Sequence, residues 1–109
     1  MRKIKNVEDA LILFETHVNT IHECSKSGNY RKSNRAYSHV ETIVKYLLEN
    51  HVLESLKTFY ESNNLFLRLY AATYLAPVDS ETCYKIIKEI MDKDEGWASF
   101  EAEYTLKDW

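Results

Sequence analysis

The sequence predicts an all-α fold of about six helices, arranged as three antiparallel pairs in an α-solenoid stack. Glycine and proline together number three among 109 residues, too few for the many tight turns of a β-sandwich or barrel. Apolar residues instead recur at three- and four-residue spacings, the period of amphipathic helices. The stretch 65–76, LFLRLYAATYLA, is apolar on nearly all sides and too short to span a membrane, so we expect a buried central helix.

The first helix pair is expected within residues 6–49. Asn6 is a suitable N-cap, with Asp9 at the third helical position. This helix should stop near Ser25, because Gly28 in the loop SKSGN can adopt a positive φ. The second helix should run from about residue 30 to residue 48 and end at Asn50. Its expected apolar stripe is Tyr37, Val40, Val44, Leu47 and Leu48, with Ala36 and Ile43 beside it.

Two further pairs are expected at 51–76 and 80–109. A third helix covers about 51–61, the polar turn SNN follows it, and Pro77 closes the central helix because the residue before a proline avoids the α region. Asp79 or Ser80 should cap the fifth helix, whose apolar residues are Cys83, Ile86, Ile87, Ile90 and Met91. Gly96 interrupts this pattern, and the sixth helix should run from about residue 98 to the end of the chain, with Tyr104, Leu106 and Trp109.

A weak internal repeat supports the stacked arrangement. Shifting the chain by 31 residues superposes LKTFYESNNLFLRLYAATYL on IKEIMDKDEGWASFEAEYTL, with the polar turn in the same place. Helix pairs of this length are typical of α-solenoids, in which neighbouring pairs share a core. We therefore predict one helical-repeat domain over residues 1–109, in which the longer pair at 6–49 forms an atypical end.

The segments LFLRLYAATYLAPVD, SNRAY and FEAEYTLKDW carry a resemblance to a known family. The first resembles the B helix of HEAT and armadillo repeats, and together they resemble a small bacterial family of unknown function with a HEAT/armadillo-like fold. The resemblance covers about residues 30–109. The chain departs from HEAT repeats in lacking a proline in the first helix of each pair, and the second unit has Ser99 where the first has Arg68. The resemblance implies a fold and no known activity.

Arg68 is the only charged residue between Glu61 and Asp79. A guanidinium in an apolar helix must reach the surface or pair with a carboxylate. From the repeat register we expect a structural bridge to Glu101 or Glu103 on the following unit, in preference to a ligand-binding arginine. Asn34 lies where the apolar stripe of the second helix would extend backwards. It is either at a half-covered helix start or a buried amide that bonds to a neighbouring segment.

Four cations, Lys26, Arg31, Lys32 and Arg35, surround the SKSGN loop. Cations at a helix start oppose the helix dipole, and together with the first backbone N–H groups they could bind an anion. The alternative is a solvated face, and the loop lacks the spacing of a phosphate-binding P-loop.

No residue pattern indicates catalysis, a cofactor or a metal. The spacings His17–His22 and His22–Cys24 do not place two ligands on one helical face, and no motif orients a histidine toward a cysteine nucleophile. Cys24 and Cys83 are expected to be free, partly buried thiols in a reducing cytosol. No signal-peptide core is evident, so a cytoplasmic protein is expected.

The function expected from the sequence is therefore a non-catalytic protein-interaction module, an adaptor or an immunity-type protein. The net charge of −3 suits a basic protein partner. One alternative is a homo-oligomeric structural protein, in which the uncovered end of the stack pairs with a second copy. Another is nucleic-acid backbone binding through residues 26–35, which the acidic balance disfavours. No membrane contact is expected.

Overall fold

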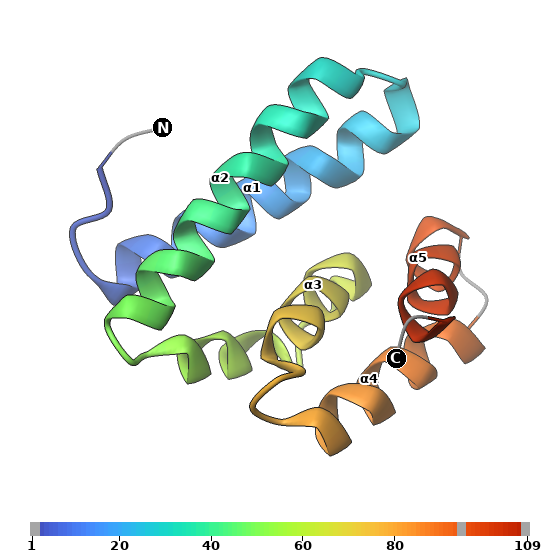
Figure 1. The fold of residues 1–109 in the computed structure, drawn as a ribbon. Coiled ribbons are helices and arrows are strands. Elements are labelled where there is room, and N and C mark those ends of the chain that lie inside the picture. Colours follow the sequence, from blue (N-terminus) through green and yellow to red (C-terminus); the bar gives the residue numbers. More distant parts are fainter. Residues whose placement is uncertain (1–2, 94–95, 108–109) are drawn as a thin grey trace. The chain divides into compact units, whose positions relative to one another are not determined.

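The computed structural model describes residues 3–93 and 96–107, which form five α-helices and one 3₁₀-helix and contain no strand (Figure 1). The all-α prediction is confirmed for these residues. The chain divides into two compact units, the first ending at Ser55 and the second beginning at Leu56. The division lies inside the short 3₁₀-helix, and the single domain over 1–109 stays a prediction.

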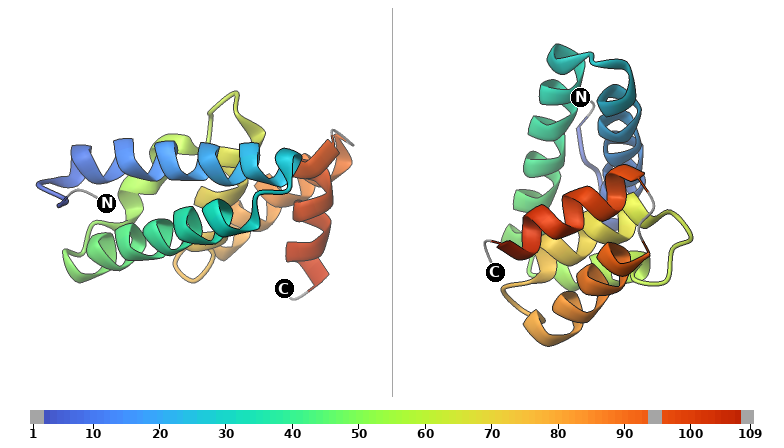
Figure 2. Two further views of the ribbon diagram at one scale, coloured as in Figure 1. Left: turned by 90° about the horizontal axis from the view of Figure 1, so that it is seen from above. Right: turned by 90° about the vertical axis from the view of Figure 1, so that its right-hand side faces the viewer.

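The first unit contains the long helices α1 (Val7–Ser27) and α2 (Tyr30–Glu49), which pack side by side (Figures 1 and 2). The predicted caps of α1 are confirmed. The Asn6 side chain accepts a hydrogen bond from the Asp9 backbone N–H at 2.8 Å. Gly28 has a φ of +76° and donates its N–H to the Cys24 carbonyl at 2.9 Å. Both ends of the helix are therefore fixed by local chemistry.

The buried side of α2 differs in part from the predicted stripe. Tyr37 and Leu48 were expected to be apolar contacts, but they are 44% and 56% exposed. The buried residues are Ala36, Val40, Ile43, Val44 and Leu47. Both sets have helical spacing, since the predicted one steps by three, four, three and one residues and the buried one by four, three, one and three. The buried side is therefore a similar stripe rotated about the helix axis. Asn34 is exposed, so the half-covered helix start is confirmed and the buried amide is wrong.

Helix α2 ends in a Schellman motif, and the next helix therefore begins later in the chain than predicted. His51 has a left-handed backbone with a φ of +58°. Its N–H bonds to the Leu48 carbonyl at 3.1 Å, and the Val52 N–H bonds to the Leu47 carbonyl at 2.9 Å. Because a left-handed residue cannot start a right-handed helix, the third helix, predicted at about 51–61, begins later, is shorter and is not an α-helix. A seven-residue 3₁₀-helix, η1 (Leu53–Phe59), takes its place.

The second unit contains helices α3 (Leu65–Leu75), α4 (Ser80–Asp92) and α5 (Gly96–Lys107). Helix α3 packs against both α4 and α5, and these two pack against each other. The buried residues of α3 are Phe66, Leu67, Leu69, Ala71, Ala72 and Leu75. They surround most of the helix, as its sequence predicts. The Asn64 side chain caps α3 by accepting from the N–H groups of Phe66 and Leu67 at 3.1 and 3.2 Å.

The 31-residue repeat describes the second helix of each pair better than the first. Helix α5 begins at Gly96, which is 31 residues after Leu65 at the start of α3, so the predicted start near residue 98 is two residues late. The elements before them differ, however, since η1 is short and 3₁₀ whereas α4 is a regular α-helix. Exposure also differs, because Leu69 is 1% exposed whereas its repeat equivalent Phe100 is 58% exposed. Trp109, predicted to end the sixth helix, lies outside the described residues.

Candidate interaction surfaces

The four predicted cations lie at the end of α1 and in the first two turns of α2, and all four are exposed. The loop between α1 and α2 supplies a hydrogen-bond acceptor for one of the unpaired backbone N–H groups at the start of α2. The Asn29 side chain accepts from the Lys32 N–H at 3.2 Å and so caps α2. An anion here would therefore meet the side chains more than the backbone N–H groups.

Exposed tyrosines accompany these cations. Tyr30 is 77% and Tyr37 is 44% exposed, and Asn34 lies between them on one stripe of the helix, because residues four and seven apart share a side. Arg31 and Arg35 form the adjacent stripe by the same spacing. We call these five residues, Tyr30, Arg31, Asn34, Arg35 and Tyr37, the basic–aromatic face of α2.

The segment that carries the basic–aromatic face contains no acidic residue, and the first carboxylate after it is Glu41, four residues beyond Tyr37. Residues 25–40 contain no Asp or Glu, although the whole chain carries a net charge of −3. The cations are evident from the sequence, whereas the apolar stripe predicted for α2 includes Tyr37. The exposed pair of tyrosines, seven residues apart, was the signal that this prediction missed.

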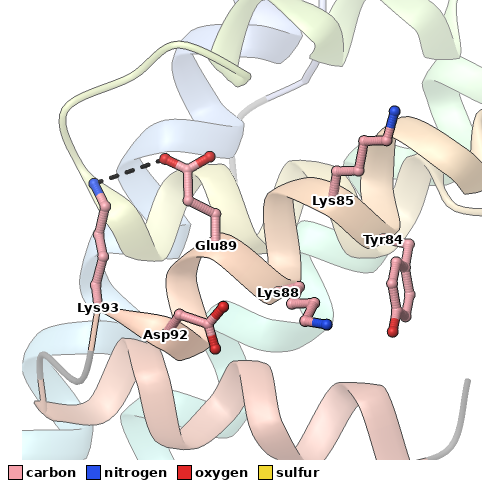
Figure 3. A pocket seen from close by; sticks show the side chains of 6 residues that line it. All are labelled: Tyr84, Lys85, Lys88, Glu89, Asp92 and Lys93. Carbon is pink, nitrogen blue, oxygen red and sulfur yellow. Dashed lines mark ion pairs between the residues drawn. The ribbon is translucent and has the colours of Figure 1, made fainter.

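A hollow runs along α4, with a volume of about 410 Å³ (Figure 3). Its described lining residues are Tyr84, Lys85, Lys88, Glu89, Asp92 and Lys93. Figure 3 shows Lys85 and Glu89 on one side of the helix and Tyr84, Lys88 and Asp92 on the other. Glu89 pairs with Lys93 at 3.9 Å. Because cations and carboxylates alternate here, the groove has no dominant charge and is typical of a solvated helix face.

Arg68 pairs with Glu89, and not with Glu101 or Glu103 as predicted. Its Nη2 lies 3.8 Å from Glu89 Oε2, and its side chain is only 13% exposed. Its Nε is buried and has no hydrogen-bond partner. The repeat register pointed to α5, whereas the carboxylate that reaches this guanidinium comes from α4. Glu103 is exposed, and burial raises the pKa of Glu101. The contact supports a structural role for Arg68, but it ties α3 to α4 and not to α5.

A polar cluster at the start of α4 connects this helix to the segment around Tyr60. The sequence did not indicate it. The Tyr60 hydroxyl donates to the Asp79 carboxylate at 3.0 Å and lies 3.3 Å from Cys83 Sγ. Lys57 Nζ lies 3.9 Å from the same carboxylate. Asp79 occupies the N-cap position of α4 without a side-chain cap bond, because its carboxylate accepts from Tyr60 instead of from the helix N–H groups. No sequence signal links Tyr60 to its two partners, because Asp79 and Cys83 lie 19 and 23 positions away from it.

The protonation states in this cluster do not favour nucleophilic chemistry. Burial, together with the contacts to Cys83 and Asp79, raises the pKa of Tyr60 far above its ordinary value. Burial also raises the pKa of the Cys83 thiol. A reactive cysteine needs a lowered pKa, so both groups stay protonated at neutral pH and act as structural contacts. Cys24 is likewise a buried free thiol.

Comparisons of the chain with protein-family models, with curated proteins and with solved structures find no match. The resemblance to a HEAT/armadillo-like bacterial family therefore stays a prediction.

The histidines were weighed as metal ligands by their sequence spacing. Within residues 3–93 and 96–107, no group of three or more His, Cys, Asp or Glu side chains could hold a metal ion. His17 instead lies against His39 of the neighbouring helix, a pairing that sequence spacing could not indicate. In the same ranges, no helix has both the length and the apolar character needed to cross a membrane.

Proposed function

We propose that this chain is a non-catalytic protein-interaction module that binds an acidic segment of a partner protein through the basic–aromatic face of α2. The observation that carries the proposal is the adjacency of two exposed tyrosines and two exposed arginines on one helix, in a stretch without a carboxylate. Tyr and Arg are the residues most enriched, with Trp, among those that dominate binding energy at protein interfaces. Tyrosine also brings a large contact area with few rotatable bonds.

The local charge of this face favours an acidic partner, whereas the net charge of the chain suits a basic one. The local charge determines which charge the partner should carry, because charges further away than about 8 Å are largely screened at physiological salt. An immunity-type protein that covers a basic partner would need an acidic face instead. The adaptor form of the prediction is therefore the better supported of the two.

The α-solenoid stack of antiparallel helix pairs fits this function, because stacked helix pairs offer extended binding surfaces. The 31-residue repeat supports this arrangement through the matching starts of α3 and α5. The HEAT/armadillo-like family, bacterial origin and cytoplasmic location inferred from the sequence belong to the same proposal.

The test measures binding of a fluorescent polyglutamate peptide by anisotropy, with a single-stranded oligonucleotide as the competing probe. We expect Arg31→Ala/Arg35→Ala and Tyr30→Ala/Tyr37→Ala each to weaken peptide binding by about tenfold or more, since interface residues of these types commonly contribute over ~1 kcal/mol each. The matched control is Lys85→Ala, which removes an exposed cation from α4 and should leave binding unchanged. Equal loss in the control, or no loss in both double variants, would contradict the proposal.

Nucleic-acid backbone binding is a second candidate that uses the same surface. Its support is the four exposed cations next to tyrosines on which unpaired bases could stack. Tighter binding of the oligonucleotide than of the peptide, with a steep dependence on salt, would favour this candidate and overturn the protein-binding proposal.

Self-association is a third candidate, supported by a different helix. Phe100 and Tyr104 lie four residues apart on α5 and are 58% and 62% exposed, so they share one side of the helix. Light scattering tests this candidate, because a mass that stays monomeric at all concentrations rules out a homodimer.

A further inference from the structure

Two histidines meet in the first unit, one from each long helix. The rings of His17 on α1 and His39 on α2 have centroids 4.6 Å apart and an edge-to-face angle of 64°. Both side chains are half-buried. His17 Nε2 and His39 Nδ1 are shielded from solvent and have no hydrogen-bond partner. The contact is therefore an aromatic one, and it leaves two polar nitrogens unsatisfied at the packed side of the helix pair.

The neighbours of each histidine on its own helix offer no negative charge. The positions three and four residues away on each helix, which are its neighbours on the helix surface, are Leu13, Phe14, Thr20 and Ile21 for His17, and Arg35, Ala36, Thr42 and Ile43 for His39. Arg35 is the one charged side chain among them, and it is a cation. Among these neighbours, a proton on either histidine would have no carboxylate to pair with, and Arg35 would repel a proton on His39.

The direction of the pKa shifts agrees with this geometry. Burial lowers the pKa of His17, and the positive charge of His39 lowers it further. Burial is also the main cause of the lowered pKa of His39, and Arg35 adds to it. Both rings are therefore neutral at neutral pH, the state in which an edge-to-face contact is favourable.

We propose that the His17–His39 contact is a pH-sensitive latch, which keeps α1 and α2 packed while both rings are neutral and releases them when the rings are protonated at mildly acidic pH. This inference does not rest on the proposed function, since it concerns the stability of the helix pair itself. Protonation of the pair should also affect the basic–aromatic face, because that face lies on α2. Arg35 belongs to the face and is also a helical neighbour of His39.

The sign of the effect follows from proton linkage. The unfolded chain binds protons on these histidines with a pKa near 6.5, above the folded values. The unfolded state therefore holds more protons below that pH, and acid favours unfolding. The contribution of the pair is fully present above about pH 6.5 and is lost as pH falls through the lower, folded-state pKa values. Each unit by which a folded pKa lies below the unfolded value lowers the folded-to-unfolded ratio tenfold.

The two other histidines of the chain, His22 and His51, provide control variants for the experiment. His22 on α1 also has a lowered pKa, from burial and from Lys26, but the charge of Glu23 opposes the shift. His51 is exposed and has a left-handed backbone, which Asn tolerates well. His51→Asn is therefore the matched control for removing a histidine, and His22→Gln measures the separate contribution of the third half-buried ring.

The experiment is urea unfolding followed by circular dichroism, between about pH 7.5 and about pH 5, the interval in which histidine titrates. We expect the wild type, His22→Gln and His51→Asn to lose stability as pH falls, and His17→Gln/His39→Gln to lose at least tenfold less in the folded-to-unfolded ratio over this interval. If the double variant loses as much as His51→Asn, the latch is wrong.

A second readout keeps the inference testable if the double variant folds poorly. NMR titration of the wild-type ring signals should give pKa values below 6.5 for His17 and His39, and the pKa of His17 should rise in His39→Gln. A purely structural contact would not move that value. Ordinary pKa values for both rings in the wild type would overturn the proposal, whether or not the acidic peptide binds.

Discussion

Replacing Arg68 with methionine tests how much of the second unit depends on its buried guanidinium. Two unit charges about 4 Å apart attract by ~1 kcal/mol in water and by ~4 kcal/mol at an effective dielectric constant near 20. The 3.8 Å pair with Glu89 belongs near the lower limit, because the Glu89 side chain is 56% exposed and also pairs with Lys93. Its net contribution is therefore about 0–1 kcal/mol.

An opposing cost arises from the same side chain. Arg68 Nε is buried without a hydrogen-bond partner, and an unsatisfied buried donor costs about 1–3 kcal/mol. Methionine removes this donor and keeps an apolar stem of similar length. We therefore expect Arg68→Met to match the wild type within about 1 kcal/mol, or to be more stable. Arg68→Ala should be about 1.5–2 kcal/mol less stable than Arg68→Met, because alanine also lacks the apolar stem, of which about two buried groups are lost at ~0.8 kcal/mol each.

Urea unfolding of Arg68→Met, Arg68→Ala and Glu89→Gln measures these terms, and the double variant Arg68→Met/Glu89→Gln gives the coupling between the two charges. We expect a coupling energy below about 1 kcal/mol. If Arg68→Met lost more than about 2 kcal/mol and the coupling energy were equally large, the ion pair would be a main stabilising contact, and the reasoning above would be refuted.

Two further substitutions test local features of the fold. Gly28→Ala should destabilise the first unit by about 1 kcal/mol, since Gly28 has a φ of +76° and no atom lies within 4 Å of an added Cβ, so that only backbone strain remains. Gly28→Asn should cost less, and equal thermal stability of all three proteins would contradict this account. Tyr60→Phe should cost about 1–2 kcal/mol, because the Asp79 carboxylate loses its hydroxyl donor. Denaturant unfolding measures this cost. An unchanged free energy of unfolding would show that Lys57 and water stabilise the Asp79 carboxylate without the Tyr60 hydroxyl.

Local chemistry made the helix ends predictable. Asn6 and Gly28 cap α1 as expected, because a cap depends on residues within a few positions of each other. The buried character of α3 was equally clear, since eleven residues with six buried side chains leave no polar side to expose. The cations of the candidate face were also identified from the sequence, because their grouping needs no knowledge of packing.

Packing decided the features that the sequence misplaced. Leu48 is as apolar as the residues that α2 buries, and the Tyr37 ring also fits an apolar stripe, so only the orientation of the helix against α1 separates exposed from buried positions. The left-handed conformation of His51 could not be anticipated, because a non-glycine residue seldom adopts it, and it changed the following helix into η1. The partner of Arg68 depended on which helix lies beside α3, and the repeat register favoured the wrong one.

By itself, the sequence determined that the chain is helical, where most of its helices begin and end, and that its cations gather around residue 30. These properties follow from backbone propensity, capping and periodicity, all of which act over a few residues. The tertiary structure alone decided that two tyrosines join those cations on an exposed face, that Tyr60 binds Asp79, and that His17 meets His39. Each of these depends on the rotation of one helix against another or on contacts between distant segments, and the spacing of residues within a single segment does not specify either.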